Sequence, residues 1–182
     1  AVTELGLDLA DYPEQIEHGI MILPKEYESK LGENIVDVLN LKEDILDFEI
    51  TSNRPDCRSI IGIAREAAVT LGKELKYPEI KVNGSDEEMQ FEIDIQTDLC
   101  KRYCGKDVKD VKIAPSPYWM QRRLIEAGMR PINNIVDITN FVLLEIGQPM
   151  HAFDLKELNG GEIVIRRAEN GEKITTLDEK EF

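Results

Sequence analysis

The sequence predicts an α+β fold. The segments ILDFEIT (45–51) and FEIDI (91–95) alternate apolar and polar residues with a period of two, as half-buried strands do. The segments 60–71, 115–128 and 133–147 carry the apolar spacing and end signals of helices. These elements follow one another without regular β-α-β alternation, which favours an α+β arrangement, with the two later helices packing on one face of a sheet.

The first half of the chain contains one predicted strand and one predicted helix. Residues 1–30 are irregular, and the strand 45–51 would bury Leu46, Phe48 and Ile50 on one face. Pro55 bars a helix at the residue before it, and Asp56 is the predicted cap of the helix that follows. That helix ends at Gly72, and its expected apolar face consists of Ile60, Ala64, Ala67, Ala68 and Leu71.

The second half contains the other elements. Residues 73–90 are expected to form an exposed connection, and 102–113 a strand or hairpin. The helix in 115–128 has Ser116 as its cap, Pro117 at its first position and Gly128 past its end. The helix in 133–147 is apolar on most of its surface, which predicts burial between layers. Residues 161–168 are predicted to form a closing strand and 173–182 a hairpin arm.

Composition restricts the classes of function. The net charge of −14 argues against a domain held on nucleic acid by bulk electrostatics. The window from Lys101 to Arg130 nevertheless contains eight basic residues and three acidic ones. A solvated basic face is the favoured interpretation of this window, and a local RNA contact is the alternative.

Several other classes of function are disfavoured by what the sequence does not contain. No apolar run approaches the roughly 20 residues that span a membrane, and the first residues do not form a secretory signal. The three cysteines, Cys57, Cys100 and Cys104, are expected to be plain thiols in a reducing cytosol, with no metal site. Motifs for phosphate, dinucleotide, zinc-protease and esterase sites are missing as well.

The segment NNIVDITN (133–140) places many short polar groups in an otherwise apolar helix. If buried, each polar group needs a partner, since an unsatisfied one costs roughly 1–3 kcal/mol. Such residues either connect neighbouring loops, which we favour from spacing alone, or line a pocket. His151 follows a Gly147-Gln148-Pro149 turn that folds the chain back toward this helix. Spacing alone favours a packing role for His151, and His18 is expected at a surface turn.

Two long strings, ITSNRPDCRSIIGIAREAA (50–68) and SPYWMQRRLIEAGMRPINNIVDITNFVLLEIGQPMHAFD (116–154), closely resemble the bacterial phenylalanyl-tRNA synthetase beta subunit. The resemblance implies a B3/B4 editing domain over 36–182, a layered sandwich of two sheet layers and a helical layer. Residues 4–24 resemble the tail of the OB-type tRNA-binding domain that precedes it in the family, so we expect 1–35 to be that tail and a connection. The chain starts without methionine and stops at Phe182 in mid-pattern, so we expect a fragment whose C-terminal part of the domain is missing.

The resemblance also implies an activity and its partners. The family's editing domain hydrolyses tyrosine mischarged onto tRNA(Phe), with a Thr-Asn pair and a histidine that match Thr139, Asn140 and His151. Thr139 is then a substrate-binding residue, Asn140 and His151 are catalytic, and the resemblance reverses the packing interpretation of His151. Arg122, Arg123 and Arg130 are the expected, weaker RNA contacts.

The remaining expectations concern the whole synthetase, a cytoplasmic α2β2 heterotetramer. ATP and magnesium act in the separate alpha subunit, and no cofactor is expected within this chain. A freestanding deacylase that acts in trans, and a module kept only for architecture and RNA contact, are the alternatives.

Overall fold

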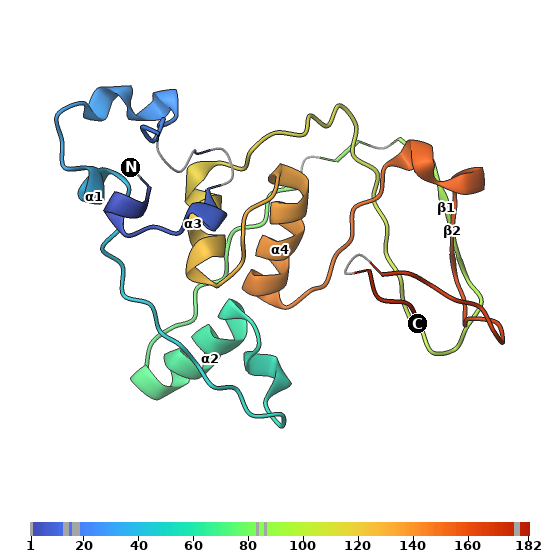
Figure 1. The fold of residues 1–182 in the computed structure, drawn as a ribbon. Helices are drawn as coiled ribbons and strands as arrows, with labels where there is room; N and C mark the ends of the chain where they lie inside the picture. Colours follow the sequence, from blue (N-terminus) through green and yellow to red (C-terminus); the bar gives the residue numbers. More distant parts are fainter. Residues whose placement is uncertain (1, 13–14, 16–18, 83, 86, 177–178) are drawn as a thin grey trace. The chain divides into compact units, whose positions relative to one another are not determined.

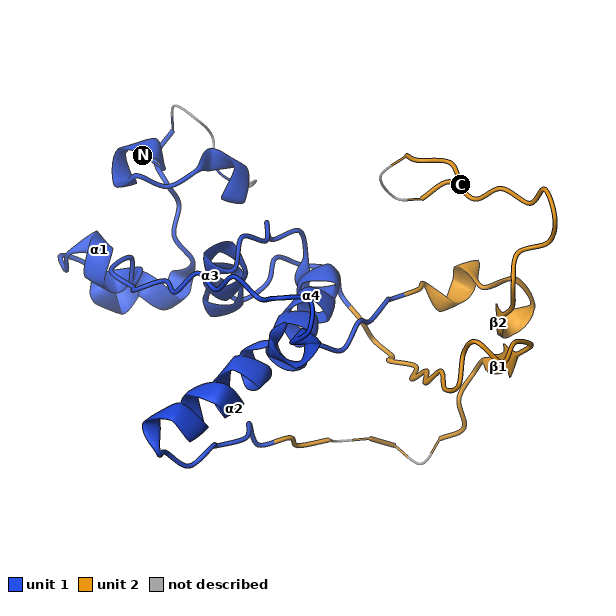
Figure 2. Ribbon diagram, turned by 90° about the horizontal axis from the view of Figure 1, so that it is seen from below, with its two compact units in different colours: residues 1–79, 112–152 blue, residues 80–111, 153–182 orange. Residues whose placement is uncertain are grey.

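The computed structural model describes residues 2–12, 15, 19–82, 84–85, 87–176 and 179–182. The chain forms two compact units, coloured separately in Figure 2. Unit 1 consists of residues 1–79 and 112–152, and unit 2 of residues 80–111 and 153–182. Each unit is assembled from two stretches of chain that are far apart in sequence.

Unit 1 is helical (Figure 1). Its α-helices are α1 (Ile35–Val38), α2 (Ile60–Leu71), α3 (Tyr118–Glu126) and α4 (Asn134–Ile146). Short 3-10 helices lie at Thr3–Leu5, Leu9–Asp11, Lys25–Lys30 and Pro55–Cys57. Helix α4 contacts both α2 and α3. In unit 1, α4 is therefore the helix against which α2 and α3 both pack.

The ends of α2 confirm the predicted helix and correct its predicted cap. Gly72 ends the helix in the left-handed region, with φ +60°. Ser59, and not Asp56, caps the start, because its Oγ accepts the backbone N–H of Gly62 at 3.2 Å. Gly62 itself lies against the preceding turn, where a Cβ would come within 1.8 Å of the Asp56 carbonyl oxygen. The close approach of this turn to α2 thus requires glycine.

Helices α3 and α4 are confirmed, again with one corrected cap. Pro117 precedes α3 without any side-chain cap, because Ser116 makes a different bond, described below. Asn133 caps α4 by accepting the backbone N–H groups of Ile135 and Val136. The predicted burial of α4 on most sides is wrong: Ile138 and Ile146 each remain 44% exposed.

Two predicted strands do not form. Residues 45–51 and 102–113 contain no strand, and Leu46, on the face that was to be buried, is 74% exposed. A period of two indicates which residues share a face, but a strand also needs a hydrogen-bonded neighbour. Within the described residues, neither segment has such a neighbour, so the prediction from the alternating pattern alone was wrong.

Unit 2 contains the strands that do form. Strand β1 (Glu92–Ile95) pairs in parallel with β2 (Glu162–Ile165), which confirms the strands predicted in 91–95 and 161–168. Near the end of the chain, Ile174 and Phe182 exchange both backbone hydrogen bonds, at 3.1 and 3.0 Å. This pairing confirms the predicted hairpin arm, of which residues 177–178 lie outside the described part of the structure.

The described fold is mixed α and β with few strands. The described strands form one two-stranded sheet, so the layered sandwich stays a prediction, as does the domain boundary at residue 35. The most buried apolar side chains, Val2, Tyr12, Leu39, Cys57 and Leu124, all belong to unit 1. Among the helices described, none is long and apolar enough to cross a membrane.

Candidate functional site

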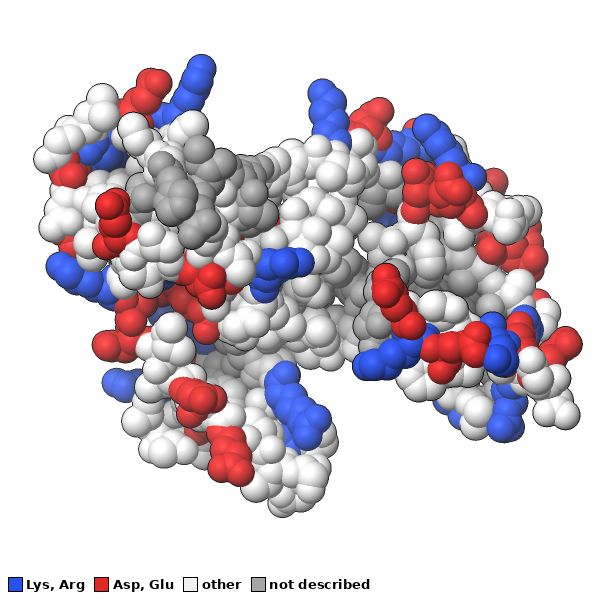
Figure 3. All heavy atoms as spheres, in the orientation of Figure 1, with Lys and Arg blue, Asp and Glu red and all other residues white. Residues whose placement is uncertain are grey.

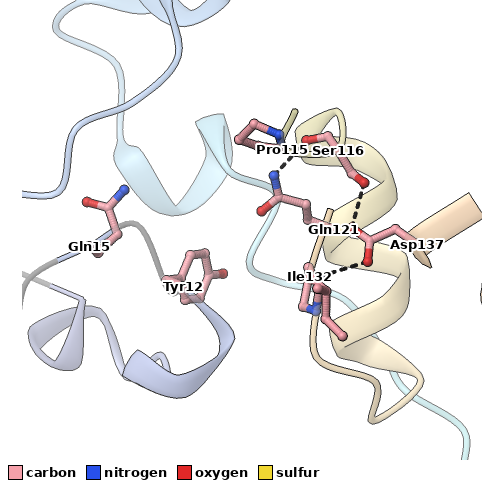
Figure 4. Close-up of a pocket in the computed structure, with 8 residues that line it drawn as sticks. Tyr12, Gln15, Pro115, Ser116, Gln121, Ile132 and Asp137 are labelled. Atoms are coloured by element: carbon pink, nitrogen blue, oxygen red, sulfur yellow. Dashed lines mark hydrogen bonds between the residues drawn. The ribbon is translucent and has the colours of Figure 1, made fainter. Parts of the chain in front are cut away.

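The first turns of α4 are fastened by a buried carboxylate. The side chain of Asp137 is 0% exposed. Its Oδ2 accepts the hydroxyl of Ser116 at 2.5 Å, and its Oδ1 accepts the backbone N–H of Ile132 at 2.8 Å. Figure 4 shows both bonds, and also the bond that the Gln121 side-chain amide donates to the Ser116 carbonyl. The carboxylate thus joins three segments: α4, the loop before it and the turn before α3.

A second polar residue ties the same segments together one turn earlier. The backbone N–H of Asn134 donates to the carbonyl of Ala114 at 2.8 Å, and its Oδ1 accepts the N–H of Ala114 at 3.2 Å. Its Nδ2 donates to the carbonyl of Lys112 at 2.9 Å. The predicted connecting role is therefore confirmed for Asn134 and Asp137, whereas Asn133 caps its own helix. Gln121 was missed by sequence reasoning, because nothing in its spacing marks a bond to the chain before its own helix.

A cavity of about 60 Å³ lies beside this cluster. Tyr12 and Gln15, from the N-terminal segment, line it together with Ser116, Gln121 and Asp137 (Figure 4). A cavity of this size has room for water.

The three residues predicted from the resemblance all belong to unit 1. Thr139 and Asn140 are consecutive, half-buried residues of α4, and His151 is exposed in the non-helical segment after it. The hydroxyl of Thr139 donates to the carbonyl of Val136 at 2.7 Å, so its lone pairs are left to accept a bond. These residues line neither the cavity beside Asp137 nor the larger cavity that adjoins Arg122. Their roles therefore stay predictions.

Of the three arginines predicted to contact RNA, Arg122 is held by contacts within the protein. Its Nη2 lies 2.7 Å from Oε1 of Glu126, and the two side chains are only 14% and 12% exposed. The same Nη2 donates to the carbonyl of Asn40 at 3.5 Å. Arg123 is 64% exposed, and Arg130 is exposed as well. These two side chains are more accessible to a polyanion than Arg122.

A larger cavity, of about 260 Å³, adjoins Arg122. It is lined by one face of α3, including Trp119 and Glu126, and by six residues that precede it in the chain: Glu26, Tyr27, Val38, Leu39, Asn40 and Glu43. Burial, and then a hydrogen bond with Glu43, raises the pKa of the Glu126 carboxyl, while Arg122 opposes the rise. Two acidic groups that share a hydrogen bond favour a proton between them.

The basic window is divided between the units. Residues 101–111 belong to unit 2 and residues 112–130 to unit 1. On the face drawn in Figure 3, acidic and basic side chains are interspersed. An RNA contact by this window stays a prediction.

One acidic group with metal-ligating atoms was not expected from the sequence. Donor atoms of Asp56, Cys57 and Glu66 lie within 4.8 Å of one another. Arg54 pairs with both carboxylates, at 2.8 Å from Asp56 and 2.6 Å from Glu66, and so already supplies a positive charge. Burial raises the pKa of the Cys57 thiol, which disfavours thiolate chemistry there. His18, the other histidine, lies outside the described residues.

Comparisons with known proteins identify what the chain resembles. Residues 99–182 match the family model of the B3/4 domain. The chain is 52% identical, over its whole length, to the phenylalanine--tRNA ligase beta subunit of Clostridium acetobutylicum, of which it covers 22%. It is 50% identical over 98% of its length to that of Clostridium tetani, covering 22%, and 43% identical over its whole length to that of Geobacillus kaustophilus, covering 23%. The chain thus spans about a fifth of the length of these relatives.

Proposed function

The chain is a homologue of the B3/4 domain region of phenylalanine--tRNA ligase beta subunits, and we propose that it edits mischarged tRNA as part of such a subunit. The proposed reaction is hydrolysis of the ester that joins tyrosine to tRNA(Phe). The observation that carries the proposal is the identity of 43–52% to these beta subunits over the whole chain. Thr139, Asn140 and His151 are the proposed site residues.

The positions of these residues support the proposal. Thr139 and Asn140 are neighbours on α4, and His151 lies in the segment that continues from the same helix within unit 1. Because a fixed helix carries two of them, their spacing does not depend on a mobile loop. The free lone pairs of Thr139 suit a hydrogen-bond donor of the substrate, such as a ribose hydroxyl or an ammonium group.

The chemistry asks little of the protein beyond positioning. An aminoacyl ester is activated, so its hydrolysis needs a placed water and stabilisation of the developing charge. A neutral imidazole carries one N–H donor and one acceptor nitrogen, so a histidine can orient that water. A pocket that hydrogen-bonds the tyrosine hydroxyl leaves its polar groups unpaired with phenylalanine, and so rejects the correct product.

The remaining parts of the proposal concern the whole protein. We expect the complete subunit to assemble with an alpha subunit, which would activate phenylalanine with ATP and magnesium, and to bind tRNA(Phe). We also expect the B3/4 domain to complete a layered sandwich around the elements described above.

The test measures deacylation of Tyr-tRNA(Phe) by the complete subunit assembled with its alpha partner. His151→Ala should slow the reaction by about 10- to 100-fold, the range expected when a reacting group loses its orientation. Gln148→Ala is the matched control, because Gln148 is exposed in the same segment and its amide donates to the carbonyl of Pro149, the next residue. Equal rates for the wild type and His151→Ala would remove His151 from the mechanism.

The same assay separates the alternatives. No deacylation by the wild-type complex would favour a module that serves architecture and RNA contact only. Deacylation by the separate chain at the rate of the complex would favour an enzyme that acts in trans.

A further inference from the structure

The proposed site residues Thr139 and Asn140 lie just beyond the buried carboxylate of Asp137 on α4. An α-helix turns about 100° and rises 1.5 Å per residue. Viewed down the helix axis, Thr139 therefore lies about 160° from Asp137, nearly opposite to it, and Asn140 lies about 60° from Asp137 in the same direction. Asp137 does not act on substrate from this position. Because the three residues belong to one helix, the contacts that fix the direction of Asp137 also fix the directions of Thr139 and Asn140.

Three side chains of α4 that share one face are each fixed to a neighbour. Asn134 bonds to the strap formed by residues 112–116, and Asp137 bonds to Ser116 in that strap and to Ile132. One turn later, the ring of Phe141 meets that of Trp119 on α3 edge to face, with centroids 5.5 Å apart. Positions i, i+3 and i+7 lie on one side of a helix, so these contacts set its rotation about its own axis.

The Asp137 contact is the most directional of the three. Both of its oxygens are used, its side chain is 0% exposed, and Ser116 is 5% exposed. A buried donor that loses its acceptor is costly, which keeps Ser116 and Ile132 on the carboxylate. A ring contact such as that of Phe141 tolerates sliding, whereas two hydrogen bonds to one carboxylate do not.

We propose that Asp137 is a positioning residue for the reaction: through Ser116 and Ile132 it holds α4 at one rotation about its own axis, and so fixes the directions in which Thr139 and Asn140 point. The inference rests on the proposed editing function. It predicts that loosening the carboxylate changes the rate of the chemical step, and leaves overall tRNA binding nearly unchanged.

The test uses three variants of the complete subunit, assembled with its alpha partner: Ser116→Ala, Asp137→Ala and Asp137→Asn. Deacylation of Tyr-tRNA(Phe) yields kcat and KM, corrected for the folded fraction. Ser116→Ala and Asp137→Ala should lower kcat by about 10- to 100-fold and leave KM within about twofold. Asp137→Asn should stay within about threefold of wild type, because the amide can accept from Ile132 and donate to the Ser116 oxygen.

If Asp137→Ala fails to fold, Ser116→Ala still decides the test. Ser116→Ala removes the hydrogen bond between Ser116 and Asp137 but retains the bond that the N–H of Ile132 donates to Asp137. A purely structural role would lower the folded fraction without changing the corrected kcat, and that result would overturn the proposal. A loss in Asp137→Asn as large as in Asp137→Ala would also overturn it.

Amide hydrogen exchange distinguishes failure of this inference from failure of the proposed function. In Ser116→Ala, the amides of α4 should exchange faster than in wild type, while those of β1 and β2 should not change. If wild type deacylates and the folded variants match its kcat, the positioning role alone fails. If wild type does not deacylate Tyr-tRNA(Phe), the proposed function and the role of Asp137 in it both fail. This holds even if hydrogen exchange shows that the Ser116–Asp137 bond stabilises α4.

Discussion

Unit 1 has exposed ion pairs, such as Lys42–Asp37, but it also buries some of its polar pairs, whereas the ion pairs described in unit 2 are all exposed. In unit 1, Asp137 and Ser116 are buried and bonded to each other, and Arg122 and Glu126 pair with most of their surface covered. In unit 2, Arg166 and Glu172 pair at 2.6 Å while remaining 42% and 38% exposed. The remaining ion pairs described in unit 2, Lys109–Glu87 and Lys173–Glu181, are exposed in the same way.

The difference indicates which unit can hold chemical groups in fixed positions. An exposed ion pair contributes about 0–1 kcal/mol and permits many geometries. A buried polar group that loses its partner costs about 1–3 kcal/mol, so its geometry is enforced. The proposed site residues belong to the unit that contains these buried contacts.

The largest expected effect tests the cores of the two units. Leu124→Ala should lower the free energy of unfolding by about 2–5 kcal/mol, because the side chain of Leu124 is 0% exposed and its loss leaves a cavity. The control in unit 2 is Val164→Ala, which should cost less because Val164 is 40% exposed. Amide hydrogen exchange reports both units separately. Equal losses would show that the units are equally well packed.

The next effect concerns a helix end. Ser59→Ala should cost about 1 kcal/mol, because the N–H of Gly62 loses its acceptor at the start of α2. Thr97→Ala in unit 2 removes a similar bond, from the N–H of Leu99 at 3.3 Å, but outside any helix. Denaturant titration should therefore show a smaller loss for Thr97→Ala. The reverse order would contradict the assignment of Ser59 as the cap.

A smaller effect depends on pH. The pKa of Glu126 is raised above its ordinary 4.5, so the folded state binds this proton more tightly than the unfolded state does. Its contribution to stability is thus fully present below pH 4.5 and is lost as pH rises through the raised pKa. The difference in unfolding free energy between wild type and Glu126→Gln, measured from pH 4 upward, should show this loss. A flat difference would contradict the burial of Glu126.

The smallest expected effect on stability comes from the ion pair between Arg166 and Glu172 in unit 2. Hydrogen bonds from Arg166 and from the backbone N–H of Glu169 lower the pKa of Glu172 to about 2. Arg166→Ala should return that pKa toward its ordinary value, as measured by carboxyl NMR titration. The lowered pKa stabilises the fold at pH values above 4.5, and this contribution is lost as pH falls through about 2. Arg167→Ala, which removes no bond to Glu172, should leave the titration unchanged.

Local sequence signals predicted the helices better than the strands. Gly72 and Gly147 end α2 and α4 in the left-handed region, where the sequence predicts those ends. A helix makes its hydrogen bonds within one segment, so its signals lie in that segment. The strand predicted at 45–51 failed because pairing depends on a partner that its own residues do not reveal.

The candidate site likewise contains residues that the sequence predicted and contacts that it did not predict. The motif resemblance alone selected Thr139, Asn140 and His151, and the structure places them in one unit. Ser116 was predicted to cap α3, because a serine before Pro-Tyr-Trp fits an N-terminal cap. Its bond to Asp137, 21 residues away, could not be derived from local spacing.

The sequence by itself determined helices α2, α3 and α4, the strands of unit 2 and the resemblance to the B3/4 domain region, since these depend on local periodicity, end signals and motif order. Only the tertiary structure decided which polar groups are buried and what they bind. Burial depends on contacts between segments distant in sequence: Asp137 became a structural carboxylate because the turn before α3 and the loop before α4 both bring it a hydrogen-bond donor.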